Sequence, residues 1–135
     1  ANYVEGTFTP TVTLVGGAGN TIPVYSTNIG RHTRIGNRVF VDIYLTGDGG
    51  AEGAGTGQIN IALPIAASGS HPTGYIGIIG WANNAAEYQI TGTIASSATT
   101  ITLSYYNLLT SVTSLTGVDQ NNVSRGIRIK FNYEV

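Results

Sequence analysis

The sequence predicts an all-β domain, a jelly-roll-like antiparallel β-sandwich, and three observations support this. Segments rich in Val, Ile, Thr and Tyr recur between clusters of Gly, Asn and Ser. The longer segments alternate between apolar and polar residues, as a half-buried strand requires, and almost none has the period of a helix. The 135 residues suit one domain with a single core, spanning residues 1–135.

Charge and cysteine content narrow the function classes. Charged residues make up 10% of the chain and the formal net charge is −1 at pH 7, so no strong field attracts nucleic acid or an anionic membrane. The absence of cysteine excludes disulfides and thiolate metal sites within the chain. No apolar run approaches the roughly twenty residues of a membrane span. We expect no nucleic-acid partner, no membrane insertion and no cofactor.

The first predicted strand is residues 6–14, "GTFTPTVTL". Phe8, Val12 and Leu14 fall on one face of this strand, and threonines occupy the other. Pro10 has no N–H to donate, so the strand is expected at the edge of a sheet.

The clearest predicted strand is residues 38–46. Its inward face is apolar, and we expect it in the core: Val39, Val41, Ile43 and Leu45. Its other face is half aromatic and half charged: Arg38, Phe40, Asp42 and Tyr44. A monomer would leave that second face partly exposed, which favours a homotrimer.

The rest of the chain continues the β pattern. The Gly-rich segment 46–57 is expected to be a loop too polar to pack. Alternate residues from Ile127 to Val135 are apolar, so the C-terminal segment is expected to pair inside a sheet. The further strands are predicted at 58–64, 74–79, 87–94, 99–105 and 125–135.

Motifs for catalysis and metal binding are mostly missing. The chain has neither a G-x-S-x-G nucleophile elbow nor a phosphate-binding loop. A Ser-His-Asp triad would need His32 or His71, and His71 lies beside Ser68 and Ser70, but a loop histidine capped by hydroxyls explains this pattern more simply. Two histidines without cysteine fall short of a zinc site. We expect no catalytic residue, no metal and no enzyme activity.

Two clusters of aromatic and amide residues suit sugar binding. An aromatic ring packs on the apolar face of a pyranose, and amides bond to its hydroxyls. The low charge of the chain favours a neutral saccharide. We expect a carbohydrate site at the exposed surface, around Trp81, Asn83, Asn84, Tyr88, Tyr105, Tyr106 and Asn107. The alternative is that Trp81 lies in the core and the tyrosines form cross-strand or subunit contacts.

A family resemblance lies in the segments "VEGTFTPTVTLVGG" and "YSTNIGRHTRIGNRVFVDIYL". They resemble a domain of tailed-bacteriophage tail fibres and tailspikes, in which an E-G-T-aromatic-T-P strand precedes a G-R-Y-T-R-I-G-N-R-V strand. The match covers roughly residues 3–45. Phe8 stands where Trp is common, and His32 where Tyr is common.

The resemblance implies a C-terminal β-sandwich at the distal part of the virion that forms a homotrimer. It also implies binding to a host cell-surface polysaccharide or other glycan during adsorption. The absence of Met, even at position 1, fits a C-terminal fragment of a longer fibre or tailspike chain. Two alternatives stay open: a virion structural domain without a ligand, and a trimerisation and folding module for a polysaccharide-degrading enzyme before Ala1.

The arginines of the motif are expected to be structural. In "TRIGNRVFV" a tight turn separates Arg34 from Arg38, and like charges so close need facing acceptors. The candidate acceptors are Glu5, Asp42, Glu134 and carbonyl groups of a neighbouring subunit. We therefore assign the following residues to structure and subunit contact: Arg31, Arg34, Arg38, Phe40, Asp42 and Tyr44.

Overall fold

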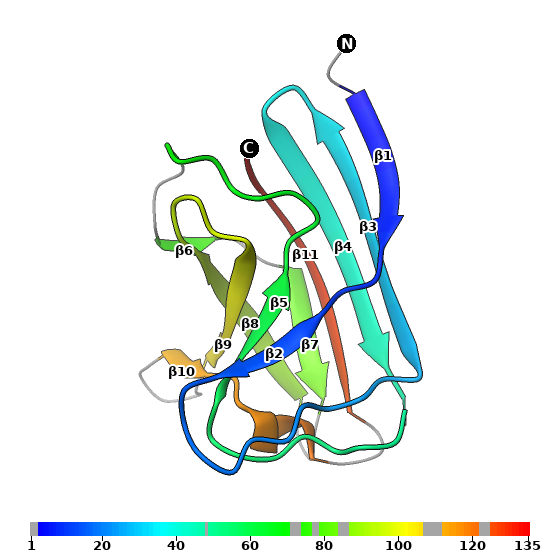
Figure 1. Cartoon of the computed structure of the whole chain (residues 1–135), viewed down its shortest axis with the longest axis vertical. Coiled ribbons are helices and arrows are strands. Elements are labelled where there is room, and N and C mark those ends of the chain that lie inside the picture. The colour runs from blue at the N-terminus through cyan, green and yellow to red at the C-terminus, as the bar shows by residue number, and fades with distance from the viewer. Residues whose placement is uncertain are drawn as a thin grey trace.

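The computed structural model is a β-sandwich of two antiparallel sheets, which confirms the all-β prediction (Figure 1). It describes residues 3–47, 49–70, 74–76, 79–83, 87–106, 112–121 and 125–135, with the backbone alone for 74–76, 79–83, 87 and 88. The elements are β1 (Tyr3–Phe8), β2 (Val12–Val15), β3 (Thr27–Ile35), β4 (Arg38–Thr46), β5 (Gln58–Ala62), β6 (Gly74–Ile76), β7 (Ile79–Asn83), β8 (Glu87–Ile94), β9 (Thr100–Tyr106), β10 (Val112–Ser114), the 3₁₀ helix η1 (Gly117–Gln120) and β11 (Gly126–Glu134).

The strands form two layers with one continuous path of hydrogen bonding. The first sheet has the order β1-β3-β4-β11, and the second has the order β7-β8-β9-β5-β2. The pairing of β11 with β7 joins them, while β6 pairs with β8 and β10 pairs with β9. Within the part of the chain that the structure describes, η1 is the only helical element.

The first predicted strand is in fact two strands in different sheets. The chain leaves the first sheet after Phe8 and joins the second at Val12, with Pro10 between them. Pro10 ends the pairing because it donates no hydrogen bond. The edge position was predicted correctly, since β1 and β2 are the two ends of the path. Residues 74–79 likewise contain all of β6 and the first residue of β7 instead of one strand.

The core follows the alternation predicted for residues 38–46 and for the C-terminal strand. Inward residues of β4 and β11 lie opposite one another in register, and none is more than 4% exposed. Burial of such side chains contributes about 1.5–3 kcal/mol each to folding. The four pairs are Val39 with Tyr133, Val41 with Phe131, Ile43 with Ile129 and Leu45 with Ile127.

Two reciprocal contacts between glycines and rings hold β1 against β3. Gly6 lies opposite His32, and Phe8 lies opposite Gly30. A Cβ at Gly6 would lie 2.6 Å from His32 Cε1, and a Cβ at Gly30 would lie 2.5 Å from Phe8 Cε1. The two rings contact each other edge to face with centroids 6.1 Å apart. Each glycine therefore leaves space for the ring on the opposite strand.

A buried arginine connects the loops at one end of the sandwich. The side chain of Arg125 is fully buried. Its Nη2 donates hydrogen bonds to the carbonyl oxygens of Val24 and Ala51, both at 2.7 Å. The guanidinium also lies 5.9 Å from the centroid of the Tyr25 ring, and the Tyr25 hydroxyl donates to Gln120 Oε1 at 2.8 Å. Two loop segments, 24–25 and the one that contains Ala51, thus converge on one cation, and Tyr25 links them to Gln120 of η1.

The Gly-rich segment packs in part: residues 49–52 are exposed, as expected of a polar loop, but Gly53 and Gly57 are buried, so the expectation of a loop too polar to pack is wrong for its second part. Its backbone forms hydrogen bonds with neighbouring segments. Gly53 N donates to the backbone carbonyl oxygen of Gln120 at 2.9 Å, and Ala54 N donates to the backbone carbonyl oxygen of Thr21 at 3.1 Å. A Cβ at Gly53 would overlap the Gly117 carbonyl oxygen. The glycines permit this close backbone approach, which a count of apolar side chains does not detect.

Replacement of Arg125 by Met is expected to lower the free energy of unfolding by about 2–4 kcal/mol, because the charge-assisted hydrogen bonds from the buried guanidinium to the Val24 and Ala51 carbonyl oxygens are lost and each oxygen keeps only its bond from a backbone N–H. Chemical denaturation measures the change. Arg31→Met is the matched control, since Arg31 is exposed and has no recorded hydrogen bond, and it should change stability by less than about 0.5 kcal/mol. Equal effects of both substitutions would contradict this role of Arg125.

Stability is expected to fall in alkali. Burial is the larger effect on Tyr133 and raises its pKa to about 12. The hydrogen bond between its hydroxyl and the Ile65 carbonyl oxygen has a smaller, opposite effect on this pKa. Burial also raises the pKa of Tyr25. A phenol whose pKa is higher in the folded state stabilises the fold below the unfolded pKa of about 10 and loses that contribution as the pH rises toward 12.

Urea denaturation at successive pH values tests this expectation. The free energy of unfolding should stay level near neutral pH and decline above about pH 10. Tyr133→Phe should lower stability at pH 7, because the Ile65 carbonyl loses its donor, but make the alkaline decline shallower. An unchanged decline in this variant would show that other groups cause it.

Candidate functional site

The outer face of the first sheet gathers most of the predicted structural residues. Cross-strand register arranges its side chains in four rows. We call two rows next to the β3–β4 turn the hairpin half: Tyr3, Ile35, Arg38 and Glu134, then Glu5, Thr33, Phe40 and Asn132. We call the next two the basic half: Thr7, Arg31, Asp42 and Lys130, then Ile29, Tyr44 and Arg128.

The hairpin half combines exposed apolar side chains with a paired arginine. Tyr3, Ile35 and Phe40 are 58%, 55% and 45% exposed. Arg38 Nη1 donates to Asn132 Oδ1 at 2.8 Å, and Arg38 Nη2 lies 3.2 Å from Glu134 Oε1. Glu134 is thus the acceptor of Arg38, one of the carboxylates that the sequence suggested. This half carries one cation and two carboxylates: Glu134 is paired with Arg38, and Glu5 accepts a hydrogen bond from the Tyr3 hydroxyl.

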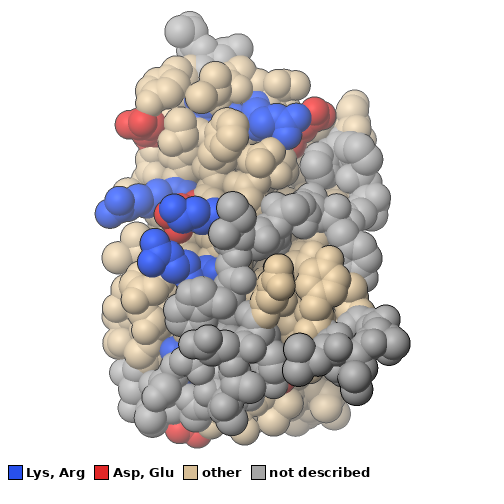
Figure 2. Space-filling view, turned by 180° about the vertical axis from the view of Figure 1, so that it is seen from behind, with Lys and Arg blue, Asp and Glu red and all other residues tan. Residues whose placement is uncertain are grey.

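The basic half has three cationic side chains, Arg31, Lys130 and Arg128, and one carboxylate, Asp42. Lys130 Nζ lies 3.3 Å from Asp42 Oδ2. The guanidinium of Arg128 lies 5.3 Å from the centroid of the Tyr44 ring. Arg31 is opposite Asp42 in register, yet it makes no recorded hydrogen bond or ion pair with any residue that the structure describes. Figure 2 shows these basic side chains gathered around an acidic group on one side of the molecule.

Arg34 lies on the opposite side of the hairpin from the other motif arginines. It pairs in register with Val39, whose side chain is in the core. Its Nε donates to the carbonyl oxygen of Gly36 at 2.8 Å, and Gly36 has the positive φ of +62° expected for this tight turn. Arg34 and Arg38 therefore do not confront each other, and the acceptor of Arg34 comes from its own turn.

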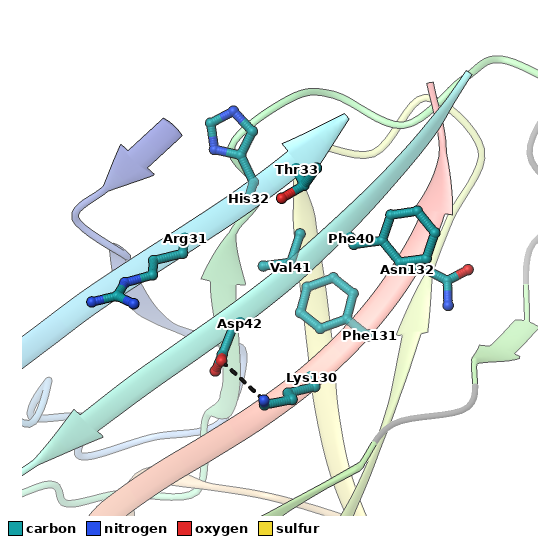
Figure 3. A pocket seen from close by; sticks show the side chains of 9 residues that line it. All are labelled: Arg31, His32, Thr33, Phe40, Val41, Asp42, Lys130, Phe131 and Asn132. Atoms are coloured by element: carbon teal, nitrogen blue, oxygen red, sulfur yellow. Dashed lines mark ion pairs between the residues drawn. The ribbon is translucent and has the colours of Figure 1, made fainter. Parts of the chain in front are cut away.

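The outer face is hollowed along β3. The first hollow has a volume of about 390 Å³ and lies over Phe40 and the Asp42–Lys130 pair (Figure 3). A second, of about 290 Å³, lies between Arg31 and Arg128, and a third, of about 540 Å³, lies over β1 and β3. Arg31 lines all three hollows. In Figure 3, Arg31, Asp42 and Lys130 extend from three neighbouring strands.

The residues predicted to bind carbohydrate lie on three adjacent strands, as far as the structure describes them. Trp81 and Asn83 belong to β7, Tyr88 belongs to β8, and Tyr105 and Tyr106 belong to β9. Asn84 and Asn107 lie outside the described residues, as do the side chains of Trp81, Asn83 and Tyr88.

The two described tyrosines of this group differ in exposure. Tyr106 is 53% exposed and lies opposite Val112 of β10. Tyr105 is partly buried and packs against the core. Trp81 lies opposite Arg128 in register, so its backbone position continues the last row of the basic half. The predicted carbohydrate residues and the basic half are thus neighbours in the fold.

Other candidate sites find no support in the described residues. No group of three or more His, Cys, Asp or Glu among them is placed to hold a metal ion, and none of their helices is long and apolar enough to cross a membrane. His32 packs between Gly6 and Phe8. His71, the other triad candidate, lies outside the described residues.

Comparison with known proteins gives no match. No protein-family model, curated protein or solved structure is similar enough to this chain to indicate a relationship. The resemblance to bacteriophage tail-fibre domains therefore depends on the two N-terminal segments alone.

Proposed function

We propose that the chain is the C-terminal domain of a tailed-bacteriophage tail fibre or tailspike. In this proposal it forms a homotrimer at the distal part of the virion and binds a carbohydrate on the host cell surface, without catalysing a reaction. The observation that carries the proposal is the outer face of the first sheet, which exposes aromatic and aliphatic side chains between ion pairs.

The two motif segments support the proposed family because they build one continuous unit. The E-G-T-F segment forms β1, and the G-R-H-T-R-I-G-N-R-V segment forms β3, the turn and the start of β4. The chain also passes between the sheets at β1–β2, β2–β3 and β4–β5, as a jelly-roll-like connection requires, while the hairpins β3–β4 and β8–β9 each stay in one sheet.

Exposed apolar residues support self-association through the outer face. Five large side chains on this one face are between 39% and 58% exposed: Tyr3, Ile29, Ile35, Phe40 and Tyr44. Tyr3, Ile35 and Phe40 lie in two adjacent rows of the hairpin half, and exposed aromatic and aliphatic side chains beside an arginine are typical of protein interfaces. We assign the contact between copies to the hairpin half, where Arg38, its one cation, is already paired with Glu134 and Asn132 within the chain.

A second candidate function is a trimerisation and folding module without a ligand of its own. The packing of Tyr105 against the core favours it, because this tyrosine then contributes to the fold and not to a sugar-binding surface. In that case the receptor or enzyme would belong to another part of a longer chain. The two candidates share the trimer and differ in whether this chain alone binds glycans.

Replacement of Phe40 by Glu is expected to convert a trimer into a monomer, because a charge would enter the apolar centre of the proposed contact. Multi-angle light scattering at micromolar concentration measures the mass. Val118→Glu is the matched control: Val118 is also exposed, at 46%, but lies in η1. A wild-type chain that is monomeric and fully stable would contradict the trimer.

Replacement of Trp81 by Ala is expected to abolish glycan or cell binding while the trimer stays folded. A stacking ring contributes roughly 0.5–1.5 kcal/mol per contact, and a trimer attached at three sites would lose this contribution at each of them. A glycan array and light scattering test the two parts. Unfolding or dissociation would assign Trp81 to the core or the interface. Full binding by a folded Trp81→Ala trimer would place the ligand elsewhere.

A further inference from the structure

We propose that the basic half of the outer face binds an acidic sugar, with Arg31 and Arg128 holding its carboxylate. The inference rests on the proposed function as a carbohydrate-binding domain. It specifies the ligand class and a site distinct from the aromatic residues predicted from the sequence. Low overall charge favoured a neutral saccharide, but the local arrangement of charges on this face favours an anion.

Among the residues that the structure describes, no hydrogen-bond acceptor is paired with either guanidinium group. Arg31 is exposed and makes no recorded hydrogen bond or ion pair with the residues that the structure describes. Arg128 contacts the Tyr44 ring, with 5.3 Å between Cζ and the ring centroid. Such a contact uses the attraction between the cation and the ring and leaves N–H groups able to donate to a carboxylate in bidentate fashion.

The carboxylate of Asp42 does not neutralise the positive charge of the basic half. Asp42 lines the same hollow as the two arginines, but its Oδ2 is paired with Lys130 at 3.3 Å. Three cations thus surround one anion. The contrast with Arg38 is direct, because Arg38 is satisfied by Glu134 and Asn132. An additional anion at the basic half would satisfy donors that the described part of the chain does not pair.

The hollow between the arginines has the size and surface of a site for one sugar ring. Its volume of about 290 Å³ is at the lower limit of small-molecule sites. Ile29 and Tyr44, which are 45% and 39% exposed, supply an apolar part of the lining beside the charged groups. A pyranose that carries a carboxylate presents the same combination, an apolar ring face next to an anion.

The experiment compares binding of sodium glucuronate with that of glucose, which has the same ring without the carboxylate. Two-dimensional NMR of the labelled wild-type chain should show saturable shifts with glucuronate, centred on residues 29–31, 42–44 and 128–130, and at least tenfold weaker binding of glucose. Arg31→Gln and Arg128→Gln should each weaken glucuronate binding about tenfold or more. Arg31→Lys should retain only part of the affinity, because it keeps the charge and loses the planar fork.

Arg38→Gln is the matched control. It removes the same charge from the same face but lies outside the hollow, so binding should change by no more than about twofold in a variant whose mass by light scattering equals that of the wild type. An equal loss in Arg38→Gln and Arg31→Gln would overturn the site, because the general field would then explain binding. Equal affinity for inorganic phosphate and glucuronate would overturn the sugar assignment in favour of an unselective anion site.

Failure of this inference is distinguishable from failure of the proposed function. Neutral glycans that bind in an array, together with unaltered binding by Arg31→Gln, would overturn the acidic-sugar site and leave the carbohydrate-binding domain intact. A monomeric Arg31→Gln variant would assign Arg31 to the subunit contact and also overturn the site. No binding of any glycan by the wild-type chain would overturn both.

Discussion

The sandwich depends on β11, the last strand of the chain. It pairs with β4 over Gly126–Glu134 and with β7 over Gly126–Lys130, so it is the strand through which the two sheets are joined in the described part of the structure. Its inward side chains fill the core, and its outward side chains complete the outer face. Arg125, directly before it, holds the loops at one end. The central strand therefore comes from the C-terminus, so the core closes only when distant parts of the chain meet, a topology that folds slowly.

A second constraint explains why the N-terminal motif has glycines where strands usually have side chains. The Gly6–His32 and Phe8–Gly30 pairs place two rings over two glycines on β1 and β3. In the family that the motif resembles, these two ring positions are commonly Trp and Tyr, which are also aromatic and could pack against an opposite glycine in the same way. The motif thus specifies how an edge strand is attached. The glycines and rings of the E-G-T-F and G-R-H segments thus attach the edge strand, whereas Arg31, between Gly30 and His32, lies on the other face of the sheet, opposite Asp42.

Local sequence pattern predicted the parts of the fold that depend on neighbours along the chain. The alternation from Arg38 to Thr46 gave both the bounds of β4 and its two faces. Pro10 predicts an edge position, but the change of sheet at Pro10 depends on the pairing partners of β1 and β2, which are β3 and β5. The same limit applies to the site. Arg128 is opposite Tyr44 only because β11 pairs with β4, and no local period encodes that partnership.

The three arginines of the motif illustrate how one local pattern yields three physical roles. Arg34 faces inward and closes its own turn through the Gly36 carbonyl. Arg38 faces outward and is neutralised by Glu134 of the central strand. Arg31 shares the outward face of Arg38, but the carboxylate opposite it, Asp42, is taken by Lys130. Their spacing in the sequence is therefore no measure of shared function: alternation separates Arg34 from the others, and the register of β11 then decides that Arg38 is paired, whereas Arg31 has no ion pair with any residue that the structure describes.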